Sequence, residues 1–420
     1  MPRPRLRPDL SAFRESRDLR LIVGGTFVAD MGAQATLVAL PYQLYIQTRS
    51  PFLVGLLGAV ELGPLVALSL LGGVVADRMD RRRLLLLGQT GALLAAGGLA
   101  AVSLAGHPPL IALYALAAAL AGCNALGNVA ETAIIPNLVD RARLPRALAV
   151  NYGLYALTMV LGPLVGGLLI SGSGVAAAYV VAAACCLAVV VPALVIAPQP
   201  PTGERSEAGV LRSIAEGLRY VRATRALLGS FAIDLVAMTF GMPRALFAVL
   251  AVSVFHAGAD GTGVLYAAVA AGATVAALLT GWINHARRLG MIVIWAVTVW
   301  GAAIALAGLM GSLWPAAALL AIAGAADSIS AVCRSTINQT VTPDHMRGRM
   351  SSVYSLVVSG GPRVGDLESG AVAGAAGVRF SVVSGGLLCL VGVAVIALAF
   401  PELARYDTAD WIPQPAPAPA

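Results

Sequence analysis

The sequence contains no lysine, so all 28 of its basic residues are arginines. Only 12% of the 420 residues are charged, whereas soluble proteins carry about 25% charged residues. A water-soluble protein of this length could not cover its surface with so few ionic groups. The shortage of charge excludes an ordinary soluble enzyme, and the 58% of hydrophobic residues exclude a disordered chain.

Cysteine and histidine are also scarce, with five and four residues. The cysteines lie in apolar stretches without a CxxC pair, and the histidines are isolated from one another. This pattern excludes a disulfide scaffold and a zinc site. We therefore expect no metal and no cofactor.

Long apolar stretches dominate what is present. A helix needs about 20 apolar residues to cross a bilayer, because its backbone groups must be satisfied within the segment. Twelve stretches meet this length, at 21–46, 52–76, 84–105, 109–133, 147–170, 175–197, 227–254, 261–284, 289–311, 314–339, 350–374 and 378–400. The sequence predicts an all-α membrane protein with twelve transmembrane helices.

The arginines are distributed unevenly between the two ends of these spans. Alternating spans place 23 of the 28 arginines on one side, against Arg49 and Arg379 on the other. Because positive loops favour the cytoplasmic side, we expect a multi-pass membrane protein with both termini in the cytoplasm. The net charge of +7 therefore results from arginines that orient the protein in the membrane. We do not expect the protein to bind nucleic acid.

The longest connector divides the chain into two halves of six spans. It begins with prolines and continues into an amphipathic stretch near 209–224, which we expect to form a helix on the cytoplasmic membrane face. The predicted domains are a cytoplasmic tail at 1–20, an N-terminal bundle at 21–197, the linker at 198–226, a C-terminal bundle at 227–400 and a cytoplasmic tail at 401–420.

Features recur between the two halves. Span five contains Gly162-Pro163-Leu-Val-Gly166, and span eleven contains Gly361-Pro362-Arg-Val-Gly365. Transporters are often built from such internal repeats, with the substrate path at the interface of the repeats.

The loop after span two carries a recognisable motif. Residues 73–82 read GVVADRMDRR and resemble the loop signature of the major facilitator superfamily, although this sequence has Asp80 where that signature has glycine. Glycine allows close helix approach, and the charged residues can cap helices or form ion pairs at a gate. We assign to this cytoplasmic gate Gly73, Asp77, Arg78, Arg81 and Arg82.

A second motif lies in span five. Gly162, Pro163, Gly166 and Gly167 resemble the motif of the exporting branches of the superfamily. Proline removes a backbone hydrogen bond and glycines expose a flat surface, so the helix can bend and pack closely. The alternative is a kinked, close-packed helix of any transporter.

The similarity extends through most of both halves. Residues 72–78, 263–268 and 328–349 resemble the bacterial enterobactin-exporter group of the superfamily. This resemblance implies a protein of the bacterial cytoplasmic membrane that exports a catecholate siderophore or amphipathic drugs, driven by the proton-motive force.

Carboxylates within the first two spans are candidates for proton coupling, because charged groups are costly at mid-membrane. Asp30 lies in the middle of span one, with Thr26 and Gln34 one turn away on the same face. It is either a coupling or substrate residue or a structural hydrogen-bond hub. Glu61 lies deep in span two before Pro64, and it either binds a proton or caps the kink.

The other buried charges lie mainly in the second half. Asp327 and Arg334 share one face of span ten, two turns apart. Arg363 and Asp366 are three residues apart in span eleven, which favours a structural ion pair, although an arginine there could attract an anionic substrate. Arg244 follows a proline in span seven and is a candidate to neutralise Asp30 or Asp327.

Two further acids and a group of aromatic residues complete the candidates. Glu131 and Asp234 lie toward the cytoplasmic ends of their spans, which favours gating or solvation over substrate binding. A catechol or drug ring can stack on aromatic side chains that line a cavity. The aromatic candidates are Tyr42, Tyr45, Tyr152, Tyr155, Phe240, Tyr266 and Tyr354.

Together these features predict a transporter that exports small amphipathic molecules in exchange for protons. We expect contacts with substrate, protons and membrane lipid, and a monomer. An importer or facilitator on the same fold is one alternative. A membrane sensor or complex subunit is another, but it would usually carry a soluble output domain. The sequence contains no nucleophile–base cluster, phosphate loop or metal set, so an enzyme is not expected.

Overall fold

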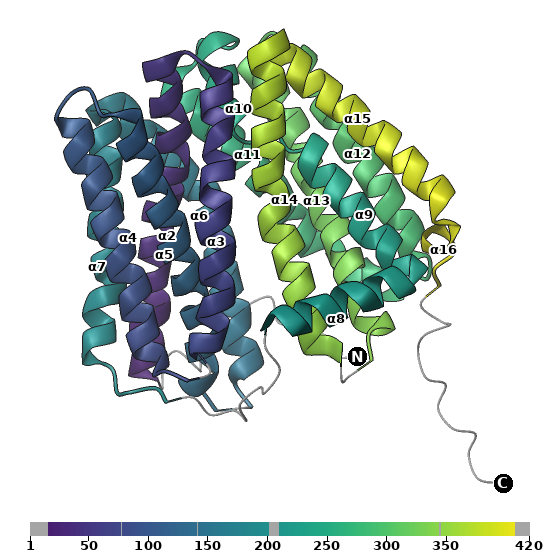
Figure 1. Ribbon diagram of the computed structural model, residues 1–420, viewed down its shortest axis with the longest axis horizontal. Coiled ribbons are helices and arrows are strands. Elements are labelled where there is room, and N and C mark those ends of the chain that lie inside the picture. Colours follow the sequence, from purple (N-terminus) through teal and green to yellow (C-terminus); the bar gives the residue numbers. More distant parts are fainter. Residues whose placement is uncertain (1–15, 77, 141, 201–209, 344–345, 408–420) are drawn as a thin grey trace. The chain divides into compact units, whose positions relative to one another are not determined.

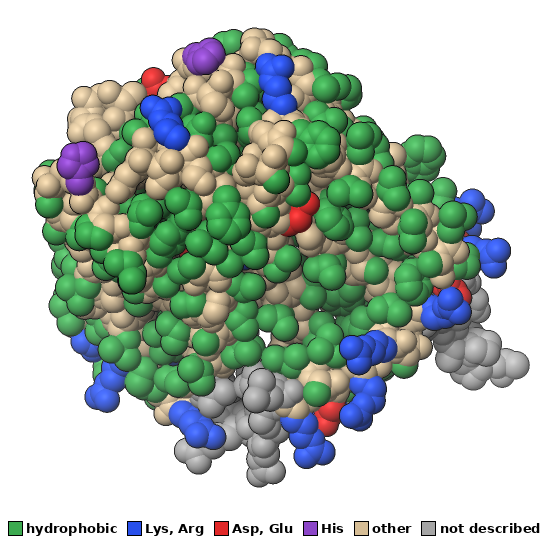
Figure 2. Space-filling model, turned by 45° about the horizontal axis from the view of Figure 1, so that its top comes forward, with side chains coloured by type: hydrophobic (Ala, Val, Ile, Leu, Met, Phe, Trp, Pro, Cys, Tyr) green, Lys and Arg blue, Asp and Glu red, His purple; other side chains and the backbone are tan. Residues whose placement is uncertain are grey.

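The computed structural model of the protein describes residues 16–76, 78–140, 142–200, 210–343 and 346–407 (Figure 1). All regular secondary structure in these ranges is helical, which confirms the predicted all-α class. Hydrophobic side chains cover most of the face shown in Figure 2. Such a surface is expected where the solvent is lipid rather than water.

Fifteen α-helices account for most of the described residues. They are α2 (Arg17–Thr48), α3 (Pro51–Ala76), α4 (Arg81–Leu104), α5 (Leu110–Ile134), α6 (Leu144–Ser173), α7 (Val175–Val195), α8 (Val210–Ala223), α9 (Arg225–Phe240), α10 (Leu246–Ser253), α11 (Gly258–Leu279), α12 (Leu289–Leu309), α13 (Leu313–Val341), α14 (Arg347–Ala376), α15 (Val378–Ala399) and α16 (Pro401–Ala404). Short 3-10 helices follow α5 and α11, at Ile135–Asn137 and Thr280–His285.

Ten helices in the described part of the chain are long and apolar enough to cross a membrane. They coincide with ten of the twelve predicted spans. The predicted eleventh span corresponds to α14, whose 30 residues are too polar for the same criterion. The predicted seventh span begins with α9, which has only 16 residues and meets α8 at an angle of 107°.

The prediction of one continuous seventh helix over 227–254 is wrong. Helix α9 ends at Phe240, and α10 begins at Leu246. Pro243 lies in the break. Its ring removes a backbone donor and disfavours the helical conformation of the residue before it, which explains why the helix stops here.

Aromatic side chains satisfy backbone carbonyl groups on both sides of this break. Trp300 of α12 donates from Nε1 to the carbonyl oxygen of Gly241 at 2.6 Å. The Tyr266 hydroxyl of α11 donates to the carbonyl oxygen of Arg244 at 2.9 Å. Irregular backbone at membrane depth requires such partners, because lipid offers none.

The chain forms two compact units. The first contains Met1–Glu207 and Arg244–Ala267, and the second contains Ala208–Pro243 and Ala268–Ala420. This division departs from the predicted bundles at 244–267, because α10 packs against α2 and α3, and the first residues of α11 pack against α6. The chain thus passes between units within the helix break and within α11.

Each unit is held together by close helix–helix packing. In the first unit α2 packs against α6 and α7, and α4 packs against α5 and α7. In the second unit α12 packs against α13 and α15, and α9 packs against α14 and α15. Small residues permit this approach: Gly88 faces the backbone of Gly127, and Gly324 faces that of Val269. Dispersion contacts between close backbones stabilise helices in lipid, where burial of apolar surface contributes little.

Candidate functional site

A polar cluster forms around Asp30, where α2, α5 and α6 meet in the first unit. Glu131 of α5 accepts a hydrogen bond from Asn151 Nδ2 of α6 at 3.4 Å. Thr26 lies one turn from Asp30 on α2, and its hydroxyl donates to the Val23 carbonyl oxygen at 3.1 Å. The charges of Asp30 and Glu131 repel each other. Two neighbouring carboxylates with little access to water do not readily ionise together, so the cluster can hold one proton.

The other candidates of the first two spans are Gln34 on α2 and Glu61 on α3. Gln34 lies one turn beyond Asp30 and donates from Nε2 to the sulfur of Met159 at 3.6 Å. Glu61 is half-buried on α3, three residues before Pro64. The cluster thus contains Asp30 and Glu131, and Gln34 contributes to the packing of α2 on α6.

Two tyrosines present an aromatic surface on α6 beside this cluster. Tyr152 is 74% exposed and Tyr155 is 46% exposed, and their ring centroids are 6.5 Å apart. The charges of Asp30, Glu131 and Arg244 all act on the Tyr155 hydroxyl. Aromatic faces, acids and a guanidinium are therefore near one another within this unit, a combination that suits an amphipathic aromatic ligand.

The glycine motif of α6 allows this helix to approach two neighbours. A Cβ atom on Gly162 would overlap the side chain of Gln34, and one on Gly166 would lie 2.7 Å from Ala35 Cα. On another side of α6, a Cβ on Gly167 would lie 2.8 Å from the carbonyl oxygen of Ala259 in α11. Close packing of α6 between α2 and α11 explains these glycines.

Pro163 belongs to the same contact. A Cβ atom on Gly263 of α11 would overlap the Pro163 carbonyl oxygen. The ring of Pro163 is buried within α6. The predicted exporter motif is therefore a packing surface for both α2 and α11.

The arginines of the predicted gate bind the ends of neighbouring helices within the first unit. Arg81 Nη1 donates to the Ala133 carbonyl oxygen at 3.1 Å and to Asn137 Oδ1 at 2.6 Å. Arg82 donates from Nε and Nη2 to the last carbonyl groups of α7, at 2.6 and 2.7 Å. A cation at the C-terminal end of a helix neutralises its unpaired carbonyl groups. These two arginines therefore stabilise the ends of α5 and α7.

Asp80 fits the position where the superfamily signature has glycine. Its φ is −55°, so the turn does not require a left-handed residue. Its Oδ1 accepts from the backbone nitrogen of Arg82 at 2.9 Å, which caps α4, and from that of Gln199 at 3.1 Å. Asp80 thus joins the start of α4 to the segment after α7.

The remaining gate residues have less defined roles. Gly73 lies on α3, and a Cβ atom there would meet open space. Arg78 follows α3 and is exposed. Asp77 lies outside the described residues, so its assignment to the gate stays a prediction.

A buried ion-pair cluster lies in the second unit. Arg334 of α13 bonds through Nη1 to Asp234 of α9, and its Nη2 is 3.7 Å from Asp327 Oδ1. The structure therefore joins the predicted pair and adds Asp234, which the sequence favoured for gating or solvation. Arg363 and Asp366 are half-buried on α14. Their mutual ion pair stays a prediction.

The two units repeat one packing arrangement, and this repeat relates Asp234 to Asp30. Gly361 of α14 faces Met238 of α9, as Gly162 of α6 faces Gln34 of α2. Asp234 precedes Met238 by four residues, and Asp30 precedes Gln34 by the same interval. The two aspartates are therefore equivalent positions. Alignment of the glycine motifs of the two halves was the signal that could have revealed Asp234.

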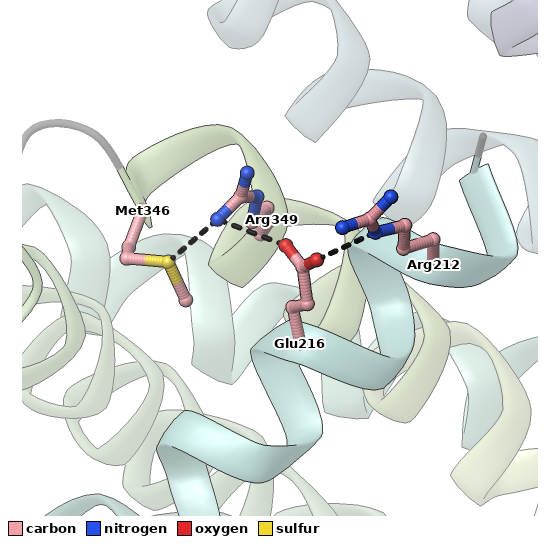
Figure 3. A network of polar contacts seen from close by, with 4 residues as sticks. All are labelled: Arg212, Glu216, Met346 and Arg349. Atoms are coloured by element: carbon pink, nitrogen blue, oxygen red, sulfur yellow. Dashed lines mark hydrogen bonds and ion pairs between the residues drawn. The ribbon is translucent and has the colours of Figure 1, made fainter. Parts of the chain in front are cut away.

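An ion-pair network attaches the linker helix α8 to the second unit (Figure 3). Glu216 pairs with Arg349 of α14 and with Arg212 of its own helix, each at 2.9 Å. The apolar residues Ile214 and Val221 are buried. The expected helix is present, but part of its apolar side is covered by the unit's own helices.

Comparison with known proteins connects these sites to a family. The profile of a family described as transmembrane secretion effector matches residues 10–419. The chain belongs to the transmembrane secretion effector family. It is accordingly a membrane transporter of the exporting type and not an enzyme, which confirms the predicted class.

This secretion effector has relatives in Shigella boydii and Citrobacter koseri. The enterobactin exporter EntS of Shigella boydii serotype 4 is 31% identical over 401 residues, which cover 95% of each chain. The enterobactin exporter EntS of Citrobacter koseri is 30% identical over 412 residues, which cover 97% of this chain and 98% of that protein. The predicted resemblance to the enterobactin-exporter group is confirmed.

Solved structures support the same fold for this family member. A POT family transporter in complex with 5-aminolevulinic acid has a TM-score of 0.76 at 12% identity, covering 94% of this chain and 98% of that chain. A bacterial homologue of the human lysosomal transporter Spinster has a TM-score of 0.70 at 16% identity, covering 94% and 98%. These similarities show the fold alone.

Proposed function

We propose that the protein exports a catecholate-type siderophore across the bacterial cytoplasmic membrane by proton antiport. The observation that carries this proposal is the similarity, over nearly the full length of both chains, to exporters of enterobactin. Drug-like amphipathic molecules are the second class of substrate. They are favoured by the exposed tyrosines of α6, because an aromatic surface accepts many ring systems.

The first unit supplies groups that suit a catecholate. Tyr152 and Tyr155 offer ring faces for stacking, and the nearby charge of Arg244 favours an anionic oxygen. Arg363 in the second unit is a further candidate to attract an anionic oxygen of the substrate. Asp366 is the candidate acid that balances the charge of Arg363. The substrate contact would thus combine aromatic and cationic groups.

The Asp30–Glu131 cluster is our candidate for proton coupling. Glu61 is a further carboxylate that we propose to bind a coupled proton. A proton that binds here removes the repulsion between Asp30 and Glu131. Protonation from outside would favour the inward-facing state, and substrate would favour the outward-facing state. Alternating access then follows from different affinities of the two states for proton and substrate.

The setting of the transporter is part of the proposal. Both termini lie in the cytoplasm, because 23 arginines occupy the corresponding tails and loops. These arginines would meet anionic lipid headgroups at the membrane surface. The protein acts as a monomer, since one chain contains both halves of the transporter.

Siderophore secretion by cells tests the substrate. A strain that makes enterobactin but lacks its own exporter would express the protein, and secreted enterobactin would be measured against an empty vector. We expect restored secretion without a change in tolerance to dyes. Unchanged secretion together with higher dye tolerance would favour the drug-like class instead.

Direction and coupling are tested in everted vesicles with an imposed pH gradient. We expect uptake of enterobactin into the vesicle lumen, which corresponds to export from the cell. Flux in the opposite direction would identify an importer. Proton-driven accumulation that stays at the unmodified level in the double variant Asp30→Asn with Glu61→Gln would contradict the proposed coupling groups.

A further inference from the structure

Three charged side chains lie together inside the second unit. Arg334 is 4% exposed and Asp234 is 2% exposed, whereas the side chain of Asp327 is 30% exposed. Arg334 forms a direct ion pair with Asp234 across α13 and α9, and its Nη2 is 3.7 Å from Asp327 Oδ1. One guanidinium therefore faces two carboxylates.

These charges do not balance when both acids are ionised. The cluster then has one surplus negative charge, which is costly among apolar helices. The two acids are not equivalent in position. Asp234 accepts a charge-assisted hydrogen bond from Arg334, which stabilises the ionised form of Asp234. Asp327 accepts no such bond from Arg334, because 3.7 Å between Nη2 and Oδ1 exceeds hydrogen-bond range. Asp327 is also the more exposed acid, so a proton reaches it more easily.

Helices α12 and α9 and the part of α11 in the second unit hold one further cation in their described residues. Helix α12, which packs on α13, has no charged residue, and neither has α11 from residue 268 to 279. Besides Asp234, α9 carries only Arg225, in its first turn. The Cys333 thiol is buried next to Arg334. Helix α14, which packs on α9, carries Arg363 together with Asp366, and this pair adds no net charge that would neutralise the surplus.

An unused hydroxyl lies beside the two charged residues of α13. Ser330 is fully buried, and its Oγ has no hydrogen-bond partner among the described residues. It is three residues after Asp327 and four before Arg334, hence on their face of the helix. A hydroxyl can donate to a carboxylate or accept from a carboxylic acid, so it suits both forms of Asp327.

We infer that Asp327 is a second proton-binding site of the transporter, with Arg334 as a positioning residue that Asp234 holds in place. The inference rests on the proposed proton antiport. A proton binds one carboxylate oxygen of Asp327 to form an O–H bond, and the charge of the cluster changes from −1 to zero. Release of that proton breaks the O–H bond and restores the ion pair with Arg334. Together with the site at Asp30 and Glu131, two protons are exchanged in each cycle.

Infrared spectroscopy of the purified full-length protein detects this proton directly. A protonated carboxyl group has a C=O stretching band that disappears when the group ionises. We expect Asp327→Asn to lose part of the titrating band, while the matched control Asp140→Asn, an exposed loop carboxylate, keeps it. The variant Asp327→Glu retains a carboxyl group and should restore a band if Asp327→Asn fails to fold. A titrating band of unchanged amplitude in folded Asp327→Asn overturns the inference.

Two neighbouring variants should shift the titration of this band in opposite directions. Asp234→Asn frees Arg334 to pair with Asp327 alone, so the midpoint of the band moves to lower pH. Arg334→Gln removes the cation that faces both acids, so the midpoint moves to higher pH. A cluster with a merely structural role would lose stability in both variants without this opposite shift.

Transport in proteoliposomes separates this inference from the proposed function. With the membrane potential clamped at zero and enterobactin as the probe, a tenfold proton gradient supports about hundredfold accumulation with two protons and about tenfold with one. We expect Asp327→Asn to reach only about the tenfold accumulation that one proton supports. If the unmodified protein accumulates enterobactin and Asp327→Asn reaches the same ratio, the second site is wrong and the proposed function stands. If the unmodified protein does not move enterobactin, the proposed function fails and the infrared bands alone decide on Asp327.

Discussion

Glu216 of the linker helix α8 and Arg349 in the first turn of α14 form an ion pair with an N–O distance of 2.9 Å. Two further contacts lie on the same side of α8. Gly217 packs directly on the backbone of Arg349, and the Tyr220 hydroxyl donates to the carbonyl oxygen of Val341 at 2.9 Å. The linker helix is therefore a structural part of the second unit rather than a free connection.

Loss of this pair should loosen α8 locally. Both side chains are partly exposed, so the pair contributes about 0.5–1 kcal/mol, which corresponds to about two- to fivefold faster amide exchange in α8. We expect this for Glu216→Gln and for Arg349→Gln in hydrogen–deuterium exchange. Arg212→Gln is the control, because Arg212 is largely exposed and its ion pair with Glu216 lies within α8 itself. Equal exchange in all three variants would show that the pair does not hold α8.

The aromatic cap on the helix break gives a second prediction. Trp300 is 1% exposed, and its Nε1 is the donor to the Gly241 carbonyl. Trp300→Phe leaves that carbonyl without its donor, which costs about 1–3 kcal/mol. We expect a lower unfolding midpoint in detergent. Trp295→Phe on the same helix removes an indole that is 62% exposed, and it should leave the midpoint nearly unchanged.

Hydropathy predicted most of the fold because span length is imposed by the bilayer. Ten predicted spans coincide with helices that can cross a membrane. The break between Phe240 and Leu246 was missed because its residues are also apolar, and a count of apolar residues cannot detect a change of direction. Pro243 was the local signal, since a proline often marks a helix boundary.

The sites were less predictable, because they depend on which helices are neighbours. The spacing of Asp327 and Arg334 on one helix predicted their common face. The partner of Arg334 is Asp234, on a different helix 100 residues earlier, and helical spacing contains no information on such a pair. Likewise, the sequence assigned Arg81 and Arg82 to a cytoplasmic gate, whereas the ends of α5 and α7 that they bind are visible only in three dimensions.

Close packing of α6 on α2 gives a third prediction. A Cβ atom on Gly166 would lie 2.7 Å from the backbone of Ala35, which can yield only if the helices separate. We expect Gly166→Ala to reduce the transport rate at least about tenfold, since small displacements within a transport site are costly. Gly153→Ala on the same helix meets open space, so it should retain transport and gain up to about 1 kcal/mol of helix propensity. Similar rates for the two variants would contradict a packing role for the motif.

A fourth prediction separates the two roles of the arginines after α3. Arg82 donates to the carbonyl oxygens of Ala193 and Leu194, whereas its exposed neighbour Arg83 carries the same charge at the same membrane surface. If these arginines acted only on orientation, Arg82→Gln and Arg83→Gln would be equivalent, because the positive-inside effect counts charges. The bonds to the end of α7 make them different. Charge-assisted hydrogen bonds contribute about 1.5–3 kcal/mol, so Arg82→Gln should lower the unfolding midpoint and expose the segment after α7 to protease, and Arg83→Gln should do neither. Arg82→Lys keeps the charge but removes the planar guanidinium, whose donors reach two carbonyl groups at once. We expect this variant to be more stable than Arg82→Gln and less stable than the unmodified protein.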